Sequence, residues 1–295
     1  MDVVVLGAGG LLGSNVVLTA QTQGASVAGT YHSDAPSLDA AMRQLDIRDE
    51  GSARDVLAEF KPDIVVNCAA MTDVDGCEEH PDRAFAVNGR APGAIAGECH
   101  ERGIAFVQVS TDYVFDGMGT EPYVESASPN PIQVYGESKL AGEHAVHEAH
   151  PDALQVRLSF VWGVHHGTGE LTGFPAWVRD RLAAGELTPL FTDQSVTPTR
   201  VGAAASTILE LVDAGTSGMF HVAARDCVTP YEFGTRICEL MAADSSFIDT
   251  GRRTDLDRPS DRPAYTCLDV KNVERTLDRS QPTLAEGLEA VSALL

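Results

Sequence analysis

Lysine is nearly missing from this sequence. Of 21 basic residues only Lys61, Lys139 and Lys271 are lysines, and 43 acidic residues give a formal net charge of −22. So negative a surface repels nucleic acid and anionic lipid, and neither is expected as a partner. Salt screens the self-repulsion of carboxylates, and acidity alone does not explain the shortage of lysine. We therefore expect a halophilic protein that works in a cytoplasm of high salt.

Long apolar runs and paired cysteines are missing too. No run reaches 18 apolar residues, and the first residues follow a strand pattern instead of that of a basic leader. We therefore expect a soluble, cytoplasmic protein with no membrane partner. No C-x-x-C pair occurs, which argues against a metal site, and a chain of 295 residues does not need a disulfide framework. All six cysteines are expected to be reduced: Cys68, Cys77, Cys99, Cys227, Cys238 and Cys267.

Strands and helices alternate through the first half of the chain. Short runs rich in valine and isoleucine predict buried strands over 2–6, 26–30, 63–68, 105–110 and 154–158. Apolar residues at helical spacing predict helices over 11–22, 52–60, 91–102 and 133–147. This alternation predicts an α/β fold with a doubly wound parallel sheet of the Rossmann type.

The pattern changes near residue 160. Glycine, proline and threonine become frequent, and helices predicted over 201–214 and 231–243 lie between irregular connections, with one more strand over 219–222. We predict a dinucleotide-binding domain over 1–160 that carries the catalytic residues. A smaller C-terminal α/β part over 161–295 is predicted to bind substrate, with an approximate boundary that the chain is free to cross again.

A glycine-rich turn follows the first predicted strand. Gly7, Gly10 and Gly13 form the pattern G-x-x-G-x-x-G, and Leu11 and Leu12 lie between the last two glycines. Glycines let the backbone approach a pyrophosphate, whose charge then lies at the N-terminus of the following helix. The pattern has the strand-then-helix context that a nucleotide site requires. It predicts dinucleotide binding.

The end of the second strand bears on the choice of dinucleotide. An acidic residue there binds the ribose hydroxyl of NAD, but this strand runs into His32 and Ser33, and the first acid is Asp34. Donors of this kind suit a 2′-phosphate, so the sequence favours NADP, with NAD as the alternative. The further residues expected to contact the cofactor are Asp46 and Ile47 at the adenine and Cys68, Ala69 and Ala70 on the nicotinamide side.

Two segments carry the predicted chemistry. Thr111 comes at the end of a predicted strand, where open α/β sheets place ligands. Tyr135 and Lys139 are four residues apart on a predicted helix and therefore share a face. An ammonium beside a phenol lowers the pKa of the phenol and favours proton transfer near neutral pH. We expect Thr111, Tyr135 and Lys139 to be catalytic.

These motifs resemble the extended short-chain dehydrogenase/reductase family. Within it, the words STDYVFDG at 110–117, VYGESKLAGE at 134–143, DQ at 193–194 and RPA at 262–264 are similar to the dTDP-4-dehydrorhamnose reductase group. The resemblance covers nearly the whole chain. It implies reduction, by NADPH or NADH, of the 4-keto group of a nucleotide-linked deoxysugar.

The resemblance also implies roles for single residues. Tyr135 would be the acid, Lys139 its pKa-lowering and ribose-binding partner, and Thr111 the anchor of the carbonyl oxygen. Where an aromatic substrate contact is expected after the fifth strand, this chain has Phe160 in place of tryptophan. The expected substrate-binding residues are Thr111, Asp112, Phe160, Gln194, Thr197 and Arg262.

Two other groups of residues are expected to be outside the chemistry. His165 and His166 stand in a glycine-rich stretch without carboxylates at metal-ligand spacing, so a mobile substrate loop is expected there. The acidic residues between 73 and 82 are expected to form a solvated face.

Three alternatives stay open. A sugar-nucleotide epimerase or dehydratase uses the same scaffold, although a dehydratase needs an acid–base pair that Asp112 and Tyr113 do not complete. A non-catalytic, NADP-binding regulatory subunit is a further alternative. A homodimer is compatible with every one of these readings.

Overall fold

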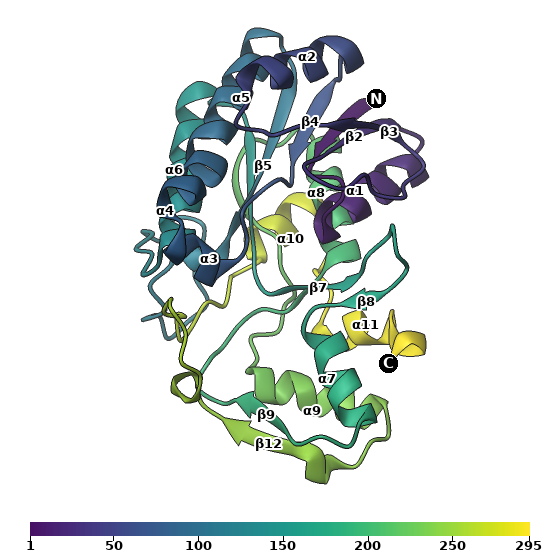
Figure 1. Cartoon of the computed structure of the whole chain (residues 1–295), viewed down its shortest axis with the longest axis vertical. Coiled ribbons are helices and arrows are strands. Elements are labelled where there is room, and N and C mark those ends of the chain that lie inside the picture. Colours follow the sequence, from purple (N-terminus) through teal and green to yellow (C-terminus); the bar gives the residue numbers. More distant parts are fainter.

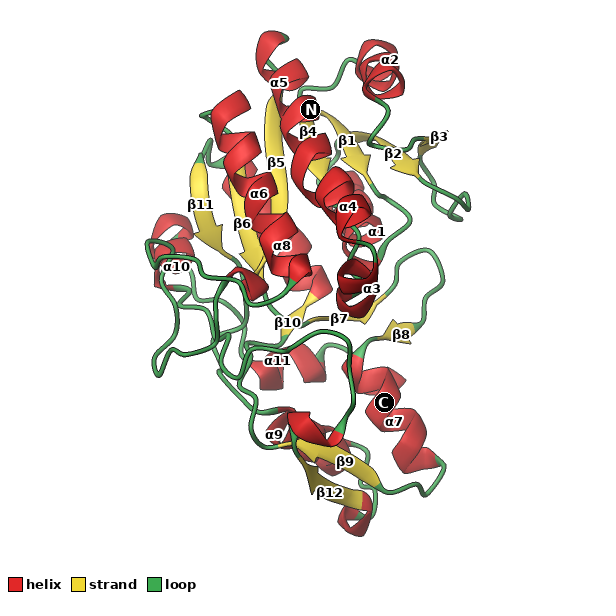
Figure 2. Cartoon of the chain, turned by 60° about the vertical axis from the view of Figure 1, so that its left-hand side comes forward, coloured by secondary structure: helices red, strands yellow, loops and turns green.

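A parallel sheet of seven strands forms the larger part of the molecule. The computed structural model describes residues 1–295, and the strand order is β11-β6-β5-β4-β1-β2-β3 (Figures 1 and 2). The strands are β1 Asp2–Leu6, β2 Ser26–Tyr31, β3 Ala41–Gln44, β4 Ile64–Asn67, β5 Ala105–Thr111, β6 Leu154–Leu158 and β11 Gly218–His221. The predicted α/β fold with a doubly wound parallel sheet is therefore confirmed.

Side chains alternate between the two faces of the sheet. On β1, Val3 and Val5 belong to one hydrophobic cluster, while Val4 and Leu6 belong to another. The first cluster includes residues of α1 (Leu11–Thr22) and α8 (Val201–Asp213). The second includes residues of α2 (Glu50–Phe60), α5 (Ala91–Glu101) and α6 (Val134–Ala149). Burial on both faces explains why these strands read as continuous apolar runs.

A smaller part lies beside the carboxyl ends of the large sheet (Figure 1). Its core includes Trp162 and Phe233, whose ring centroids are 5.4 Å apart. It contains two small sheets, β10-β7-β8 and β12-β9. Their strands are β7 Val161–Val164, β8 Leu171–Thr172, β9 Thr188–Phe191, β10 Thr199–Arg200 and β12 Ile248–Gly251. The remaining helices of the chain are α3 Val74–Glu79, α4 Pro81–Ala84, a π-helical segment Phe85–Arg90, α7 Phe174–Ala183, α9 Pro230–Leu240, α10 Lys271–Leu277 and α11 Leu284–Glu289.

The chain crosses between the two parts more than once. After β7–β10 it returns to the large sheet as α8 and β11, and β11 pairs in parallel with β6. Residues of α10 also join the hydrophobic cluster under α1 and α8. Segments on both sides of residue 160 therefore contribute to the large sheet. The predicted division of the chain into a cofactor-binding part and a substrate-binding part stays a prediction about function.

Two cysteines are joined, so the expectation of six reduced cysteines is wrong. Cys227 and Cys267 form a disulfide, with Cα atoms 5.5 Å apart and a sequence separation of 40. Cys227 follows β11, and Cys267 precedes Leu268, which bridges to Tyr123. The fold brings them together from separate segments, which no local spacing reveals. Cys68, Cys77, Cys99 and Cys238 are free. No helix in the structure has both the length and the apolar character needed to cross a membrane.

We expect the thermal stability of the protein to rise with salt. With a net charge of −22, repulsion among carboxylates destabilises the folded state, and counterions screen it. The melting temperature, followed by circular dichroism, should increase by several degrees between about 0.2 M and about 3 M KCl. A melting temperature that does not depend on KCl would contradict the halophilic interpretation.

Candidate active site

The glycine turn between β1 and α1 is closely packed. Gly7 has a φ of +75°, and a Cβ there would lie 2.8 Å from the backbone of Ala69. A Cβ on Gly13 would overlap the carbonyl oxygen of Gly7, which accepts a hydrogen bond of 3.0 Å from the amide of Gly10. A Cβ on Gly10 would meet only that oxygen, at 3.4 Å. Gly7 and Gly13 therefore allow the turn to form, and Gly10 leaves its outer surface open to a ligand.

A cavity of about 460 Å³ opens over this turn. Of the residues expected at the cofactor, Leu11, Leu12, Gly13, Ser33, Tyr135 and Lys139 do not line it. Sequence reasoning missed Arg48 and Arg83, two cations that do. The expected residues that line the cavity are Gly7, Gly10, His32, Asp46, Ile47, Cys68, Ala69 and Ala70.

The end of the cavity beside β2 carries paired charges. Arg48 Nε donates to Asp46 Oδ1 at 2.9 Å, and this guanidinium holds the pKa of Asp46 at about 2. His32 Nε2 lies 3.7 Å from Asp46 Oδ2, and its Nδ1 lies 2.9 Å from the hydroxyl of Ser33. Asp46 is thus neutralised by Arg48, so the side chains around it offer donors as well as an acceptor.

The predicted catalytic residues lie together at the end of β5 and the start of α6. Thr111 is the last residue of β5, and Tyr135 and Lys139 stand in the first turns of α6. The Thr111 hydroxyl lies close enough to the Tyr135 phenol to lower its pKa, and Lys139 is 3% exposed. Cys68 of the cofactor cavity is near enough to Lys139 for each to shift the pKa of the other. The structure therefore brings Thr111 and Tyr135 together and places Lys139 near Cys68, although none of the three lines the cofactor cavity.

The pKa values differ from the sequence expectation. Burial raises the pKa of Tyr135 above its usual value, and the carboxylate of Asp112 adds to this rise. Burial lowers the pKa of Lys139 to about 8. The Lys139 ammonium donates to the carbonyl oxygen of Val109 at 2.6 Å and not to the phenol. Lys139 is not among the causes of the Tyr135 shift, of which burial is the largest, so the expected lowering of the pKa of Tyr135 by Lys139 is not seen in this arrangement.

A buried ion pair holds α6 against the sheet. Glu143 accepts hydrogen bonds from Arg157 Nε at 2.9 Å and Arg157 Nη2 at 2.6 Å, and from the Ser110 hydroxyl at 2.5 Å. Both charged side chains are 5% exposed. Arg157 is on β6 and Ser110 precedes Thr111 on β5. Since Lys139 stands one turn before Glu143, this cluster fixes the catalytic helix relative to both strands.

An apolar cavity of about 360 Å³ lies on the side of the smaller part. Phe160 lines it and has a φ of +43°, an uncommon conformation for a bulky residue. Gln194 lines it too. Thr197 does not, and its amide instead bonds the Ser159 hydroxyl at 3.3 Å. Aromatic residues missed by sequence reasoning complete the wall: Tyr113, Phe174, Trp177 and Phe191.

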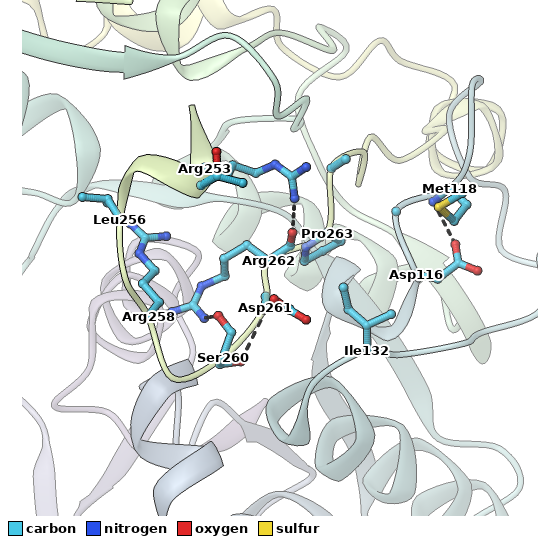
Figure 3. Close-up of a pocket in the computed structure, with 13 residues that line it drawn as sticks. Asp116, Met118, Ile132, Arg253, Leu256, Arg258, Ser260, Asp261, Arg262 and Pro263 are labelled. Carbon is cyan, nitrogen blue, oxygen red and sulfur yellow. Dashed lines mark hydrogen bonds between the residues drawn. The ribbon is translucent and has the colours of Figure 1, made fainter. Parts of the chain in front are cut away.

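Three arginines surround a second cavity of about 360 Å³ next to the apolar one (Figure 3). They are Arg253, Arg258 and Arg262, of which only Arg262 was expected. Arg253 donates to the backbone of Asp193 and Arg262. Arg258 forms no ion pair, lies 5.5 Å from the ring of Phe191 and lines both cavities. The two cavities thus adjoin at one unpaired guanidinium.

Two expectations about surface segments need correction. Asp75 forms a bidentate pair with Arg262, at 3.1 and 2.9 Å, and Glu78 accepts a hydrogen bond from the amide of Val134. These two acids therefore connect segments, whereas Asp73, Glu79 and Asp82 are exposed, so the expected solvated face is confirmed only for those three. His165 Nε2 lies 3.0 Å from the carbonyl oxygen of Gly9, so its loop packs on the glycine turn instead of over the substrate cavity. Contacts between distant segments determine the placement of the acidic residues and of the His165 loop, and a local sequence pattern does not contain such contacts.

Comparisons with known proteins agree with this geometry. The RmlD substrate binding domain family matches residues 1–295. The chain belongs to the RmlD substrate binding domain family. A relative from Haloferax volcanii named "probable low-salt glycan biosynthesis reductase Agl14" is 53% identical over 99% of this chain and 98% of its own. A dTDP-4-dehydrorhamnose reductase from Mycolicibacterium smegmatis is 35% identical over 90% of this chain and 77% of its own.

A solved structure is also similar to this RmlD family member over nearly its whole length. The dTDP-4-dehydrorhamnose reductase from Bacillus anthracis, in complex with NADP, has a TM-score of 0.83 and is 27% identical. The match covers 98% of this chain and 97% of that one. This chain and the Bacillus anthracis reductase therefore share one fold over nearly the whole length of both chains.

The raised pKa of Asp112 allows a test of the buried site through the pH dependence of the free energy of unfolding. Burial raises its pKa from 3.8 to about 6, although Ser159 donates to it at 2.7 Å. The folded protein therefore binds a proton between about pH 4 and 6 that the unfolded chain has already lost, so stability falls as pH rises through this window. Relative to Asp112→Asn, the wild type should lose about 3 kcal/mol of unfolding free energy between about pH 4 and 7.

Urea unfolding of both proteins at a series of pH values, in high salt, measures this difference. The Asn side chain keeps a polar group in place but does not titrate, so other groups cancel in the comparison. A difference between the two proteins that stays flat with pH would show that Asp112 is ionised throughout.

Proposed function

We propose that this protein reduces the 4-keto group of a nucleotide-linked deoxysugar with NADPH, in particular dTDP-4-dehydrorhamnose to dTDP-L-rhamnose. The observation that carries the proposal is that Thr111 meets Tyr135 at the end of β5, with Lys139 near Cys68 of the cavity over the glycine turn. Two dTDP-4-dehydrorhamnose reductases among the similar proteins support the substrate. The name of the Haloferax volcanii relative supports a place in glycan synthesis.

The residues around the glycine turn fit a dinucleotide. Gly10 leaves the approach open where a larger side chain would fill it, and the N-terminus of α1 lies directly behind. When bound, NADPH supplies the hydride. For NADP over NAD we rely on His32, Ser33 and Arg48, which offer donors to a 2′-phosphate, and on the NADP complex of the Bacillus anthracis reductase. Cys68, Ala69 and Ala70 leave space on the nicotinamide side.

The proton follows a separate route. The Tyr135 hydroxyl gives its proton to the keto oxygen as the carbonyl carbon gains hydride, which turns C=O into CH–OH. Thr111 donates a hydrogen bond to the same oxygen. A phenol with a raised pKa holds its proton at neutral pH, which suits a general acid. Lys139, with its pKa lowered to about 8, is the adjacent group that can replace the proton.

The two cavities of the smaller part suit a nucleotide diphosphate. Aromatic walls such as Phe174 and Trp177 suit the flat base, and Phe160 supplies an apolar face nearer the sugar. Arg258 lies where the cavities adjoin and is free to pair with a diphosphate. Asp112, Gln194, Thr197 and Arg262 remain proposed contacts, of which Gln194 and Arg262 line these cavities. A homodimer and a cytoplasm of high salt also remain predictions.

Replacing the proton donor tests the reaction. Tyr135→Phe should lower kcat about 10²- to 10⁴-fold, the usual contribution of a general acid, with the affinity for NADPH unchanged. Turnover is measured as NADPH oxidation with dTDP-4-dehydrorhamnose and other 4-keto nucleotide sugars. Tyr231→Phe, which removes a hydroxyl from α9 outside the site, is the matched control. A fully active Tyr135→Phe protein would refute the assignment, and no turnover by wild type with any substrate would favour the regulatory-subunit alternative.

Replacing the unpaired arginine tests substrate binding. Arg258→Gln should raise the KM for the nucleotide sugar about tenfold or more, because a charge-assisted contact to the diphosphate is lost. The KM for NADPH should not change. Arg275→Gln removes the same charge from an exposed position on α10 and serves as control. Equal KM values in the two variants would place the diphosphate elsewhere.

A further inference from the structure

A third polar cavity lies outside the site described above. It has a volume of about 700 Å³ and is lined by residues at the N-terminus of α8 and in the segment that leads into α11. In this region β10 contacts both helices (Figure 2). It shares no lining residue with the cofactor cavity or with the two substrate cavities. Its walls include three arginines, Arg200, Arg225 and Arg279.

Two of these arginines are neutralised by the protein. Arg279 Nε lies 2.6 Å from Glu210 Oε2, and Arg225 Nε lies 3.2 Å from Glu274 Oε1. Arg200 has no such partner: its Nε is buried without a hydrogen bond, and burial alone lowers its pKa. In a chain with twice as many acidic as basic residues, a half-buried arginine without a carboxylate is conspicuous, since a buried charge without a partner is costly.

The position of Arg200 adds to this cost. It is the residue immediately before α8, a helix of 13 residues that has no side-chain cap and no acidic residue in its first turn. The N-terminus of a helix carries partial positive charge and favours an anion. A guanidinium and a helix N-terminus therefore adjoin with no negative charge between them, which is the arrangement of an anion site.

The remaining wall is polar and partly unsatisfied. Gln281 is 2% exposed, its Nε2 has no hydrogen-bond partner, and its Oε1 accepts a bond of 3.2 Å from Thr207. Gly202 leaves room for the guanidinium, because a Cβ there would lie 2.7 Å from Arg200 Nη1.

The carboxylates of this wall are already engaged. Glu210 also accepts a hydrogen bond from Ser206, at 3.0 Å, beside its pair with Arg279. Glu286 is held by the amide and hydroxyl of Thr283 at 2.7 and 2.8 Å. Neither acid forms an ion pair with Arg200, so the guanidinium and the amide of Gln281 both lack an acceptor.

We propose that this cavity binds a phosphate group through Arg200, the first turn of α8 and the side-chain amide of Gln281. The planar fork of a guanidinium donates to two phosphate oxygens, and free amides at the helix N-terminus donate hydrogen bonds to a third. The cavity has room for the phosphate and for part of the molecule that carries it. The site is separate from the proposed reaction and does not rest on it.

Titration calorimetry with inorganic phosphate tests the site in the full chain, at constant ionic strength. Saturating NADP⁺ and dTDP are present so that the nucleotide sites are occupied. Wild type should show one saturable site, and Arg200→Gln should weaken it about tenfold or more. Arg275→Gln, which removes an exposed arginine outside the cavity, should bind phosphate as wild type does. The affinity for NADP⁺, measured separately, reports whether each variant is folded.

A second variant keeps the test decisive if Arg200→Gln does not fold. Gln281→Glu replaces the proposed donor amide by a carboxylate that repels phosphate, so it should abolish phosphate binding. Absence of a saturable site in wild type, or equal phosphate affinity in wild type and Gln281→Glu, would overturn the proposal.

Discussion

The buried pair of Glu143 and Arg157 is the contact on which the geometry of the site depends. Glu143 stands on α6, and its partners stand on the two strands that end at the crevice. Removing one partner of such a pair leaves an uncompensated charge and typically costs about 3–5 kcal/mol. Because Tyr135 and Lys139 precede Glu143 on the same helix, a shift of that helix would carry both away from Thr111. The pair thus links the stability of the core to the position of the proton donor.

Charge is divided unevenly over the molecule. Carboxylates dominate the sequence, yet arginines gather where the proposed ligands carry phosphates. Most of these arginines are paired with acids of the chain, as Arg262 is with Asp75. The unpaired ones, Arg258 and Arg200, are therefore the informative cations. Arginine suits these places better than lysine, because its flat, weakly hydrated head can pair with oxyanions while stacked on a ring such as Phe191.

Features that depend on residues close together in the sequence could be predicted from it. The helices that cover the large sheet and all its strands except β3 followed from apolar spacing; β3 was missed because it is mostly exposed and carries no apolar run. Tyr135 with Lys139 followed from four-residue spacing on one helix. Contacts between distant segments were beyond this reasoning. Asp75 and Arg262 meet across 187 residues, and Cys227 meets Cys267 only because the chain folds back. Arg258 and Trp177 lie in stretches without a periodic signal. The left-handed backbone of Phe160 was equally hidden, since bulky residues rarely adopt it.

Because the chain returns to the large sheet, the two parts of the molecule cannot be separated without disrupting that sheet. A fragment ending near residue 160 would leave β6 as an unprotected edge, open to pairing with other chains. It would also strip α8 from the face of α1 and expose the apolar cluster beneath. Neither part can be inherited, exchanged or expressed alone without exposing that cluster. The two walls of the crevice have separate cores, but the chain that forms them passes from one to the other and back.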